Sequence, residues 1–150
     1  MSPNLEQELI SIDPIFFEES IACVNGEMNQ IDTCMFWGID CDDGWFTPLK
    51  AFAEQMKLLN KLAIEENFKC VCSQLKEKYG RCCIYYGFKR VDETKPVGEL
   101  YDTLVEIIDR TIYLAEDSCD AFCEVCGSKD NLTYTEGWIK RVCDKCKEKY

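Results

Sequence analysis

Two pairs of cysteines near the C-terminus constrain this chain more than any other feature. Cys123 and Cys126 form one C-x-x-C turn, Cys143 and Cys146 form a second, and the 16 residues 127–142 separate them. A C-x-x-C turn aims two sulfurs at one point while backbone amides stabilise the thiolates. The spacing lies in the range of about 15 to 20 residues typical of zinc sites. The sequence therefore predicts one structural Zn²⁺ bound by these cysteines, with no ligand position left for water.

The segment between the two pairs favours a short hairpin around Gly137. Its apolar residues should cover the metal, and they are Leu132, Tyr134, Trp138, Ile139 and Val142. We expect a zinc ribbon over residues 119–150. Because so small a unit cannot fold alone, zinc should supply on the order of 10 kcal/mol of its folding free energy. A redox-active dithiol pair is the main alternative.

The other cysteines leave two further possibilities open. Cys119 lies close enough to Cys123 in sequence to compete as a ligand. A second zinc could form across a hairpin from Cys70, Cys72, Cys82 and Cys83. The favoured interpretation is that these cysteines pack as small apolar residues. Because the chain begins with no basic and apolar export signal and has no membrane-length apolar run, we expect a soluble protein of the reducing cytoplasm.

The charge is distributed unevenly along the chain. The net charge is −11, with 28 acidic and 17 basic residues, and the first base is Lys50. The segment before it therefore carries only acids: Glu6, Glu8, Asp13, Glu18, Glu19, Glu27, Asp32, Asp40, Asp42 and Asp43. An acidic surface repels nucleic acid and attracts basic protein surfaces.

Helix signals occur at four places. Ser2-Pro3, Asp13-Pro14 and Thr47-Pro48 each place a capping residue before a proline at a first helical position. Apolar residues then recur at helical spacing, most clearly from Phe52 onward and from Leu100 onward. The pattern predicts helices over about 3–11, 14–22, 47–65 and 100–118.

Strand signals occur between these helices. Residues 31–41 are rich in β-branched, aromatic and sulfur-containing side chains, which favours a strand before a turn at 42–44. Residues 68–75 and 81–88 predict a hairpin with Gly80 near its turn. The chain is thus expected to be an α+β protein, a helix-plus-hairpin body with a C-terminal zinc ribbon of four cysteine ligands. We divide it into an acidic helical segment (1–33), a body (34–118) and the ribbon (119–150).

The sequence contains few of the residues and motifs that are typical of enzyme active sites. Histidine is absent, which removes the commonest general base. The carboxylates of Asp40, Asp42 and Asp43 could form half of an acid/base or divalent-metal site, but no second motif completes it. We therefore expect no catalytic activity. Lys140 and Arg141 could let the ribbon contact nucleic acid, although acids and bases balance there, and direct nucleic-acid binding is not the favoured expectation.

Several short motifs together resemble a family of small, uncharacterised phage and prophage zinc-knuckle proteins. They are Trp37-Gly38-Ile39-Asp40-Cys41-Asp42-Asp43-Gly44-Trp45, Lys76-Glu77-Lys78-Tyr79-Gly80, Cys123-Glu124-Val125-Cys126-Gly127, Gly137-Trp138-Ile139-Lys140 and Cys143-Asp144. The resemblance covers roughly residues 34–147. Where that family often has histidine as its last ligand this chain has Cys146, and Cys82-Cys83 replace its usual Leu-Arg.

The resemblance implies a phage or prophage origin, and small phage proteins often act by binding a host protein. Together with the acidic segment it suggests an inhibitor of a host defence nuclease, such as a CRISPR effector, of the anti-CRISPR type. Phe36 is one candidate aromatic anchor. The other candidate contact residues are Phe16, Phe17, Glu18, Glu19, Asp40, Asp42, Asp43 and Trp45. The alternative is a zinc-ribbon transcription or nucleic-acid accessory protein, with the basic residues of the ribbon on one face.

Overall fold

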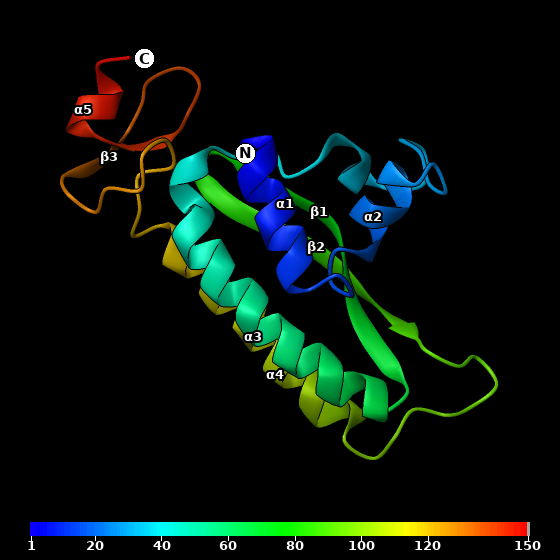
Figure 1. Ribbon diagram of the computed structural model, residues 1–150. Helices are drawn as coiled ribbons and strands as arrows, with labels where there is room; N and C mark the ends of the chain where they lie inside the picture. The colour runs from blue at the N-terminus through cyan, green and yellow to red at the C-terminus, as the bar shows by residue number, and fades with distance from the viewer. Residues whose placement is uncertain (150) are drawn as a thin grey trace.

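The computed structural model describes residues 1–149, and it is an α+β protein as the sequence predicts (Figure 1). The helices are α1 (Pro3–Ile12), α2 (Glu18–Val24), α3 (Phe46–Glu65), α4 (Tyr101–Cys119) and α5 (Asp144–Lys147), with 3-10 turns η1 (Cys34–Trp37) and η2 (Asp43–Trp45). The strands are β1 (Phe68–Lys78), β2 (Arg81–Arg90), β3 (Leu132–Tyr134) and β4 (Arg141–Cys143). They pair as two antiparallel hairpins, β1–β2 and β3–β4.

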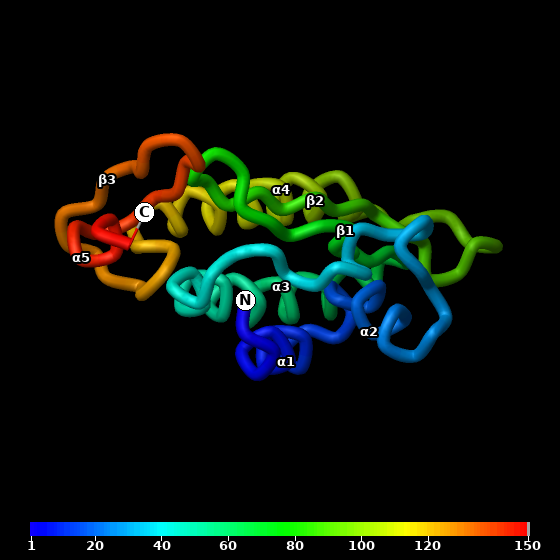
Figure 2. The backbone as a smooth tube through the Cα atoms, turned by 90° about the horizontal axis from the view of Figure 1, so that it is seen from above, coloured from blue at the N-terminus to red at the C-terminus, as the bar shows by residue number. Residues whose placement is uncertain are grey.

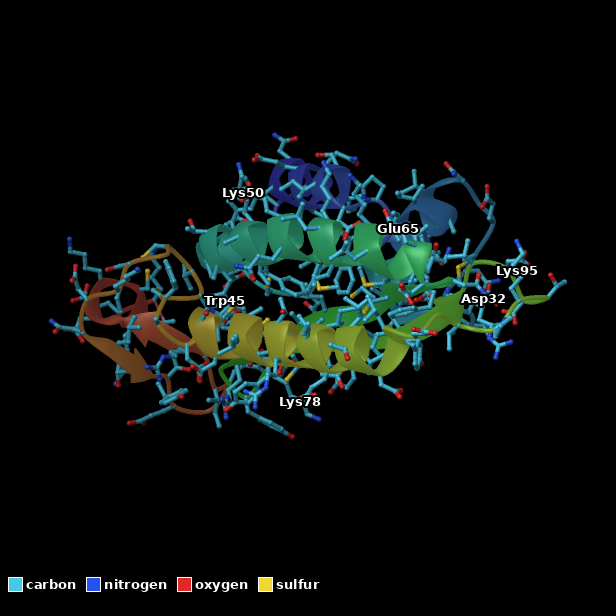
Figure 3. All side chains as sticks on the ribbon, turned by 90° about the horizontal axis from the view of Figure 1, so that it is seen from below. Asp32, Trp45, Lys50, Glu65, Lys78 and Lys95 are labelled. Atoms are coloured by element: carbon cyan, nitrogen blue, oxygen red, sulfur yellow. The ribbon has the colours of Figure 1, made fainter. Side chains whose placement is uncertain are left out.

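The body consists of a long hairpin covered by helices. α3 and α4 lie side by side along one face of β1–β2, and α1 lies beside α3 (Figures 2 and 3). Apolar side chains from all these elements meet in one core. Its buried members include Leu9, Phe16, Phe17, Trp45, Phe52, Met56, Phe68, Leu75 and Ile108. Burying this apolar surface is the main force that holds the body together.

The predicted helices α3 and α4 follow their apolar spacing closely. Phe52 and Met56, one turn apart on α3, are both buried. On α4 the buried side chains recur every three or four residues, at Leu104, Ile108, Ile112, Ala115 and Cys119. Both helices therefore turn one apolar stripe toward the hairpin and leave the opposite face in water.

The turn and register of β1–β2 explain its burial pattern. Tyr79 and Gly80 at the tip both have positive φ, of 55° and 77°, which is the backbone of the two-residue turns that match strand twist. The register shifts between Cys72 and Gln74. This bulge changes which residues face the core, so that Cys70 and Cys72 are buried before it and Leu75 after it.

Two sequence predictions need correction. Residues 31–41 form no strand, because Thr33 accepts a hydrogen bond from the Met35 backbone N–H and starts η1, which Gly38 ends with φ 76°. Only Asp40 pairs with the sheet, as an isolated bridge to Lys76. Helix α2 begins four residues later than predicted, since residues 14–17 form a turn that the Asp13 side chain stabilises.

The core buries three residues that the sequence suggested for partner binding, two from the acidic segment and one from the body. Phe16, Phe17 and Trp45 are fully buried in the core. Phe16 meets Phe17 and Phe52 edge to face, with ring centroids 5.1 and 5.4 Å apart. Large aromatic rings gain more from this burial than from exposure, so none of the three is available as an anchor for a partner.

The ribbon has its own small core at the far end of α4. Cys123, Val142, Cys143 and Cys146 are buried there, with Leu132 packed against them. This core is separate from that of the body. Across the described residues 1–149, none of the helices has the length and apolarity needed to cross a membrane.

Candidate metal centre

The four predicted cysteine ligands converge. The sulfur atoms of Cys123, Cys126, Cys143 and Cys146 all lie within 4.8 Å of one another. Those of Cys126 and Cys143 are 3.7 Å apart. The cluster thus offers four soft sulfur donors to one metal ion, the donor set of structural zinc sites. The residues fit zinc, and its role here would be structural, because protein sulfur takes every tetrahedral position.

Backbone hydrogen bonds shape the first knuckle, Cys123–Cys126. The N–H of Gly127 donates to the Cys123 carbonyl at 2.8 Å, and the N–H of Cys123 donates to the Ser128 carbonyl at 2.7 Å. Gly127 has φ 75°, a conformation that glycine adopts without steric cost. The glycine after the second cysteine therefore closes the turn that brings Cys123 and Cys126 together.

The second knuckle spans the end of β4 and the start of α5. Cys143 is the last residue of β4 and Cys146 lies within α5. Val142 and Leu132 cover the cluster as expected, but Trp138 does not, since 74% of its side chain is exposed. Ile139 and Tyr134 are exposed as well. Only part of the predicted apolar cover therefore packs near the sulfurs.

The Cys123 thiol has a lowered pKa. Burial opposes charge on Cys123, but the backbone N–H groups of Cys143, Cys126 and Val125 outweigh it and lower the pKa of this thiol to about 7. Burial raises the pKa of Cys146 to about 12, and neighbouring cysteines add to the rise. Four thiolates cannot share this space without a cation, and a bound Zn²⁺ would supply the missing charge.

The other cysteines stay outside the cluster. Cys119 is buried in the core of the body, where it interacts with Cys82, and it is not part of the metal-binding group. Within residues 1–149 no second group of this kind forms. Burial raises the pKa of Cys70 and of Cys72 well above the usual value. These thiols pack as small apolar side chains, the interpretation that the sequence favoured.

The ribbon is joined to the body at Gly44. The N–H of Gly44 donates to the Glu124 carbonyl at 2.7 Å. A Cβ at Gly44 would overlap the carbonyl oxygens of Cys123 and Glu124. The metal knuckle and the turn before α3 therefore approach more closely than any residue but glycine allows.

Two partly buried ion pairs of Lys140 reinforce this joint. The Lys140 ammonium lies 2.7 Å from Asp42 and 2.8 Å from Glu124, which is fully buried. Burial raises the pKa of Glu124, an effect that Lys140 only partly offsets. Burial alone would lower the pKa of Lys140, but the two carboxylates outweigh it and raise that pKa. Reasoning from sequence missed Glu124, although its place inside the first knuckle was a signal.

Most acids proposed for partner binding have partners within the chain. Glu18 pairs with Lys69 and Lys89, and Glu19, which is buried, also pairs with Lys89. These contacts pair two of the seven acids of residues 1–33 with lysines of the long hairpin. The same segment is therefore less negative at its surface than its composition indicates.

The acids before α3 have different roles. Asp42 pairs with Lys140, and Asp43 accepts a hydrogen bond from the Ser2 backbone N–H at 2.6 Å. Asp40 is exposed. The backbone of Asp40 is hydrogen-bonded to strand β1. The Asp40 N–H donates to the Leu75 carbonyl, and the Asp40 carbonyl accepts from the Glu77 N–H. These acids help attach the ribbon and η2 to the body.

Comparisons with known proteins give no lead to a relative. No protein-family model, no curated protein and no solved structure matches this chain. Its function must therefore be inferred from its own residues and their geometry.

Proposed function

We propose that this chain is a non-catalytic zinc-binding protein that docks onto a basic protein surface. The finer form of the proposal is a phage-encoded inhibitor of a host defence nuclease, of the anti-CRISPR type, acting in the host cytoplasm. Four cysteines suited to a structural metal support the zinc-binding part. The composition of residues 1–49, with ten acids and no lysine or arginine, supports a basic partner.

The observation that carries the docking proposal is an exposed apolar segment, residues 24–37, which we call the docking segment. It runs from the last residue of α2 through η1 and carries exposed acids at Glu27 and Asp32. Its large exposed apolar side chains are Val24 (83% exposed), Ile31 (88%), Phe36 (42%) and Trp37 (70%). Exposed tryptophan and phenylalanine are typical anchors of protein interfaces.

The two aromatic rings of this segment pack against each other. The rings of Phe36 and Trp37 meet edge to face with centroids 5.1 Å apart. Ring contact within the free chain restricts both side chains, which lowers the side-chain entropy that a partner's binding would cost. The surrounding acids would steer a basic surface toward the pair and speed association. Phe36 and Trp37 thus take the place of the buried rings that the sequence suggested.

The alternative of a nucleic-acid accessory protein has weaker support. The two ribbon bases that suggested it are engaged within the chain. Lys140 pairs with Asp42 and Glu124. Arg141 donates to the Asp120 carbonyl and to the Tyr134 hydroxyl. Phosphate contacts need cations that face solvent, so Lys140 and Arg141 as folded offer little to nucleic acid.

A comparative pull-down tests the proposal. The zinc-loaded chain, the Trp37→Ala variant and a Tyr113→Ala control would be used as baits in bacterial lysate at low and high salt. Tyr113 suits the control because it is an aromatic residue on α4 with similar exposure, 66%. We expect a basic nuclease to be captured by the wild-type chain and the control, to be lost with Trp37→Ala, and to be released by salt.

The captured nuclease would then be assayed with and without the chain. Inhibition by the wild-type chain and not by Trp37→Ala would support the anti-defence form of the proposal. Capture that is unchanged by Trp37→Ala, or capture of acidic proteins or nucleic acid alone, would contradict docking through residues 24–37.

A further inference from the structure

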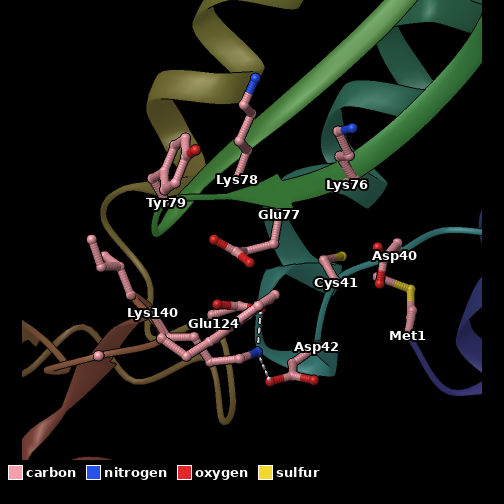
Figure 4. A pocket seen from close by; sticks show the side chains of 13 residues that line it. Met1, Asp40, Cys41, Asp42, Lys76, Glu77, Lys78, Tyr79, Glu124 and Lys140 are labelled. Carbon is pink, nitrogen blue, oxygen red and sulfur yellow. Dashed lines mark hydrogen bonds and ion pairs between the residues drawn. The ribbon is translucent and has the colours of Figure 1, made fainter.

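A pocket of about 640 Å³ opens where the ribbon meets the tip of the long hairpin (Figure 4). One wall comes from β1 and carries Glu77, and the segment before α3 contributes Asp40 and Asp42. The ribbon supplies Glu124, Lys140 and Trp138. This volume is within the range of small-molecule sites. None of residues 24–37 lines the pocket, so a ligand site there does not depend on the proposed docking segment.

The buried carboxylate of Glu124 has one oxygen without a partner. Its Oε1 accepts from the Lys140 ammonium at 2.8 Å, whereas Oε2 is buried and makes no hydrogen bond. A buried carboxylate oxygen left unpaired costs free energy, and native structures rarely keep one without a use. A donor that entered the pocket and reached Oε2 would remove this cost.

The carboxylates beside the unpaired oxygen of Glu124 favour a cationic donor. Glu77 points into the same space as Glu124, and its Oε1 accepts from the Gly80 N–H at 2.6 Å. The neighbouring lysines of β1 turn away from that space (Figure 4). Lys76 lies over the ring of Tyr85 and Lys78 over that of Tyr79. Lys76, Lys78 and the Met1 ammonium also line the pocket, so acids and bases balance over the lining as a whole. Within the described residues, however, no lysine or arginine forms an ion pair with Glu77, and Oε2 of Glu124 stays without a donor.

We propose that this pocket binds an organic cation, an alkylammonium or guanidinium group, between the carboxylates of Glu77 and Glu124. Trp138 lines the same pocket with a largely exposed indole, and a tryptophan face attracts such cations. An ammonium group is already bound by carboxylates at the edge of this pocket, because Lys140 pairs with both Asp42 and Glu124.

A divalent metal is a poorer ligand for this pocket. Metal sites need three or more donor atoms close together, and in the part of the chain that the structure describes only the four ribbon cysteines form such a group. The carboxylates of Glu77 and Glu124 can instead accept hydrogen bonds from the several N–H donors of a guanidinium or ammonium group.

NMR titration of the intact zinc-loaded chain tests this inference. The probes are argininamide and spermidine as free cations and an acetylated Gly-Arg-Gly amide as a peptide. We expect shifts at the Trp138 indole N–H and at the amides of Glu77 and Glu124. Glu77→Gln should weaken binding at least about tenfold, because it removes a charged acceptor and keeps the oxygen that binds the Gly80 N–H.

Two further variants make the result decisive. Glu124→Gln should weaken binding to a similar degree, and the cobalt-thiolate spectrum of that variant would verify an intact knuckle. Glu106→Gln, an exposed acid on α4, is the control and should bind as the wild-type chain does. No shift with any probe up to about 10 mM, or shifts that Glu77→Gln leaves unchanged, would overturn the proposal.

The probes also distinguish the source of the cation. Equal affinity for argininamide, spermidine and the peptide would identify a site for a free small cation. Markedly tighter binding of the peptide would identify the side chain of a basic protein segment as the ligand. Either pattern supports a cation site.

Discussion

The body and the ribbon use the same residue type in opposite ways. In the body, Cys70 and Cys72 are buried among apolar side chains, and burial raises their pKa so that they stay protonated. In the ribbon, Cys123 lies among backbone N–H donors that lower its pKa to about 7. A thiol in apolar surroundings is a small hydrophobic group, and a thiol in a knuckle is a metal ligand.

The two regions therefore differ in what stabilises them. The body buries rings and aliphatic chains from α1, α3, α4 and the long hairpin in one core. The ribbon buries three of its four clustered cysteines together with Val142 and little else. Its apolar burial is small against the entropy of ordering roughly 30 residues, about 1 to 2 kcal/mol for each backbone residue, so we expect a bound metal to supply the difference.

Removing zinc should have the largest effect, and only on the ribbon. Chelation is expected to withdraw on the order of 10 kcal/mol of binding free energy and unfold residues 123–147. Hydrogen exchange would detect this as lost protection in β3 and β4, with protection kept in β1 and β2. Simultaneous loss of protection in both hairpins would contradict the distinction between the regions.

Phe16→Ala should have the converse effect. Removing a fully buried ring from the core of the body is expected to cost about 3 to 5 kcal/mol of unfolding free energy and to leave zinc affinity unchanged. Denaturant unfolding and a zinc competition assay measure the two quantities. Phe36→Ala, at an exposed ring, is the control and should change stability by less than about 0.5 kcal/mol.

Gly44→Ala tests the joint between the regions. The added Cβ would overlap backbone carbonyls of the knuckle, and we expect a cost of about 3 kcal/mol, measured by thermal unfolding of the zinc-loaded chain. Gly87→Ala is the matched control, because nothing lies within 4 Å of a Cβ there. Equal stability of the two variants would show that the ribbon does not pack on η2 as described.

Lys140→Met should weaken the same joint by less, about 2 kcal/mol. The change removes the ammonium from Asp42 and leaves the carboxylate of Glu124 buried without its partner. Urea unfolding would measure the loss, with Lys147→Met on the exposed face of α5 as the control. A Lys140→Met chain as stable as the wild type would mean that the pair adds nothing to the attachment of the ribbon.

Local patterns in the sequence predicted what depends on local chemistry. The spacing of the cysteine pairs predicted the cluster, and apolar periodicity predicted α3, α4 and the long hairpin. Residues 31–41 were misjudged because Thr33 and Gly38 favour a 3-10 turn over the strand that their neighbours' composition suggests. Phe16 and Trp45 were taken for surface anchors because a sequence does not show which aromatic rings the core will bury.

Long-range contacts lay beyond the reach of sequence patterns. The pairing of Lys140 with Asp42 joins residues 98 positions apart, and no periodicity signals it. Glu18 and Glu19 counted toward an acidic surface until the fold placed Lys89 beside them. The composition of the acidic segment therefore favours a basic partner more strongly than its folded surface does, because some of its acids are already paired with lysines.

Metal content is the sharpest test of the ribbon as a structural zinc site. Elemental analysis of the purified chain should give one zinc per chain, and cobalt substitution should give the absorption bands of a tetrahedral thiolate site. Cys126→Ser should abolish tight binding, while Cys70→Ser, which changes a buried thiol of the body, should keep one zinc. No bound metal, two metals per chain, or equal loss in both variants would contradict a single zinc held by the four ribbon cysteines.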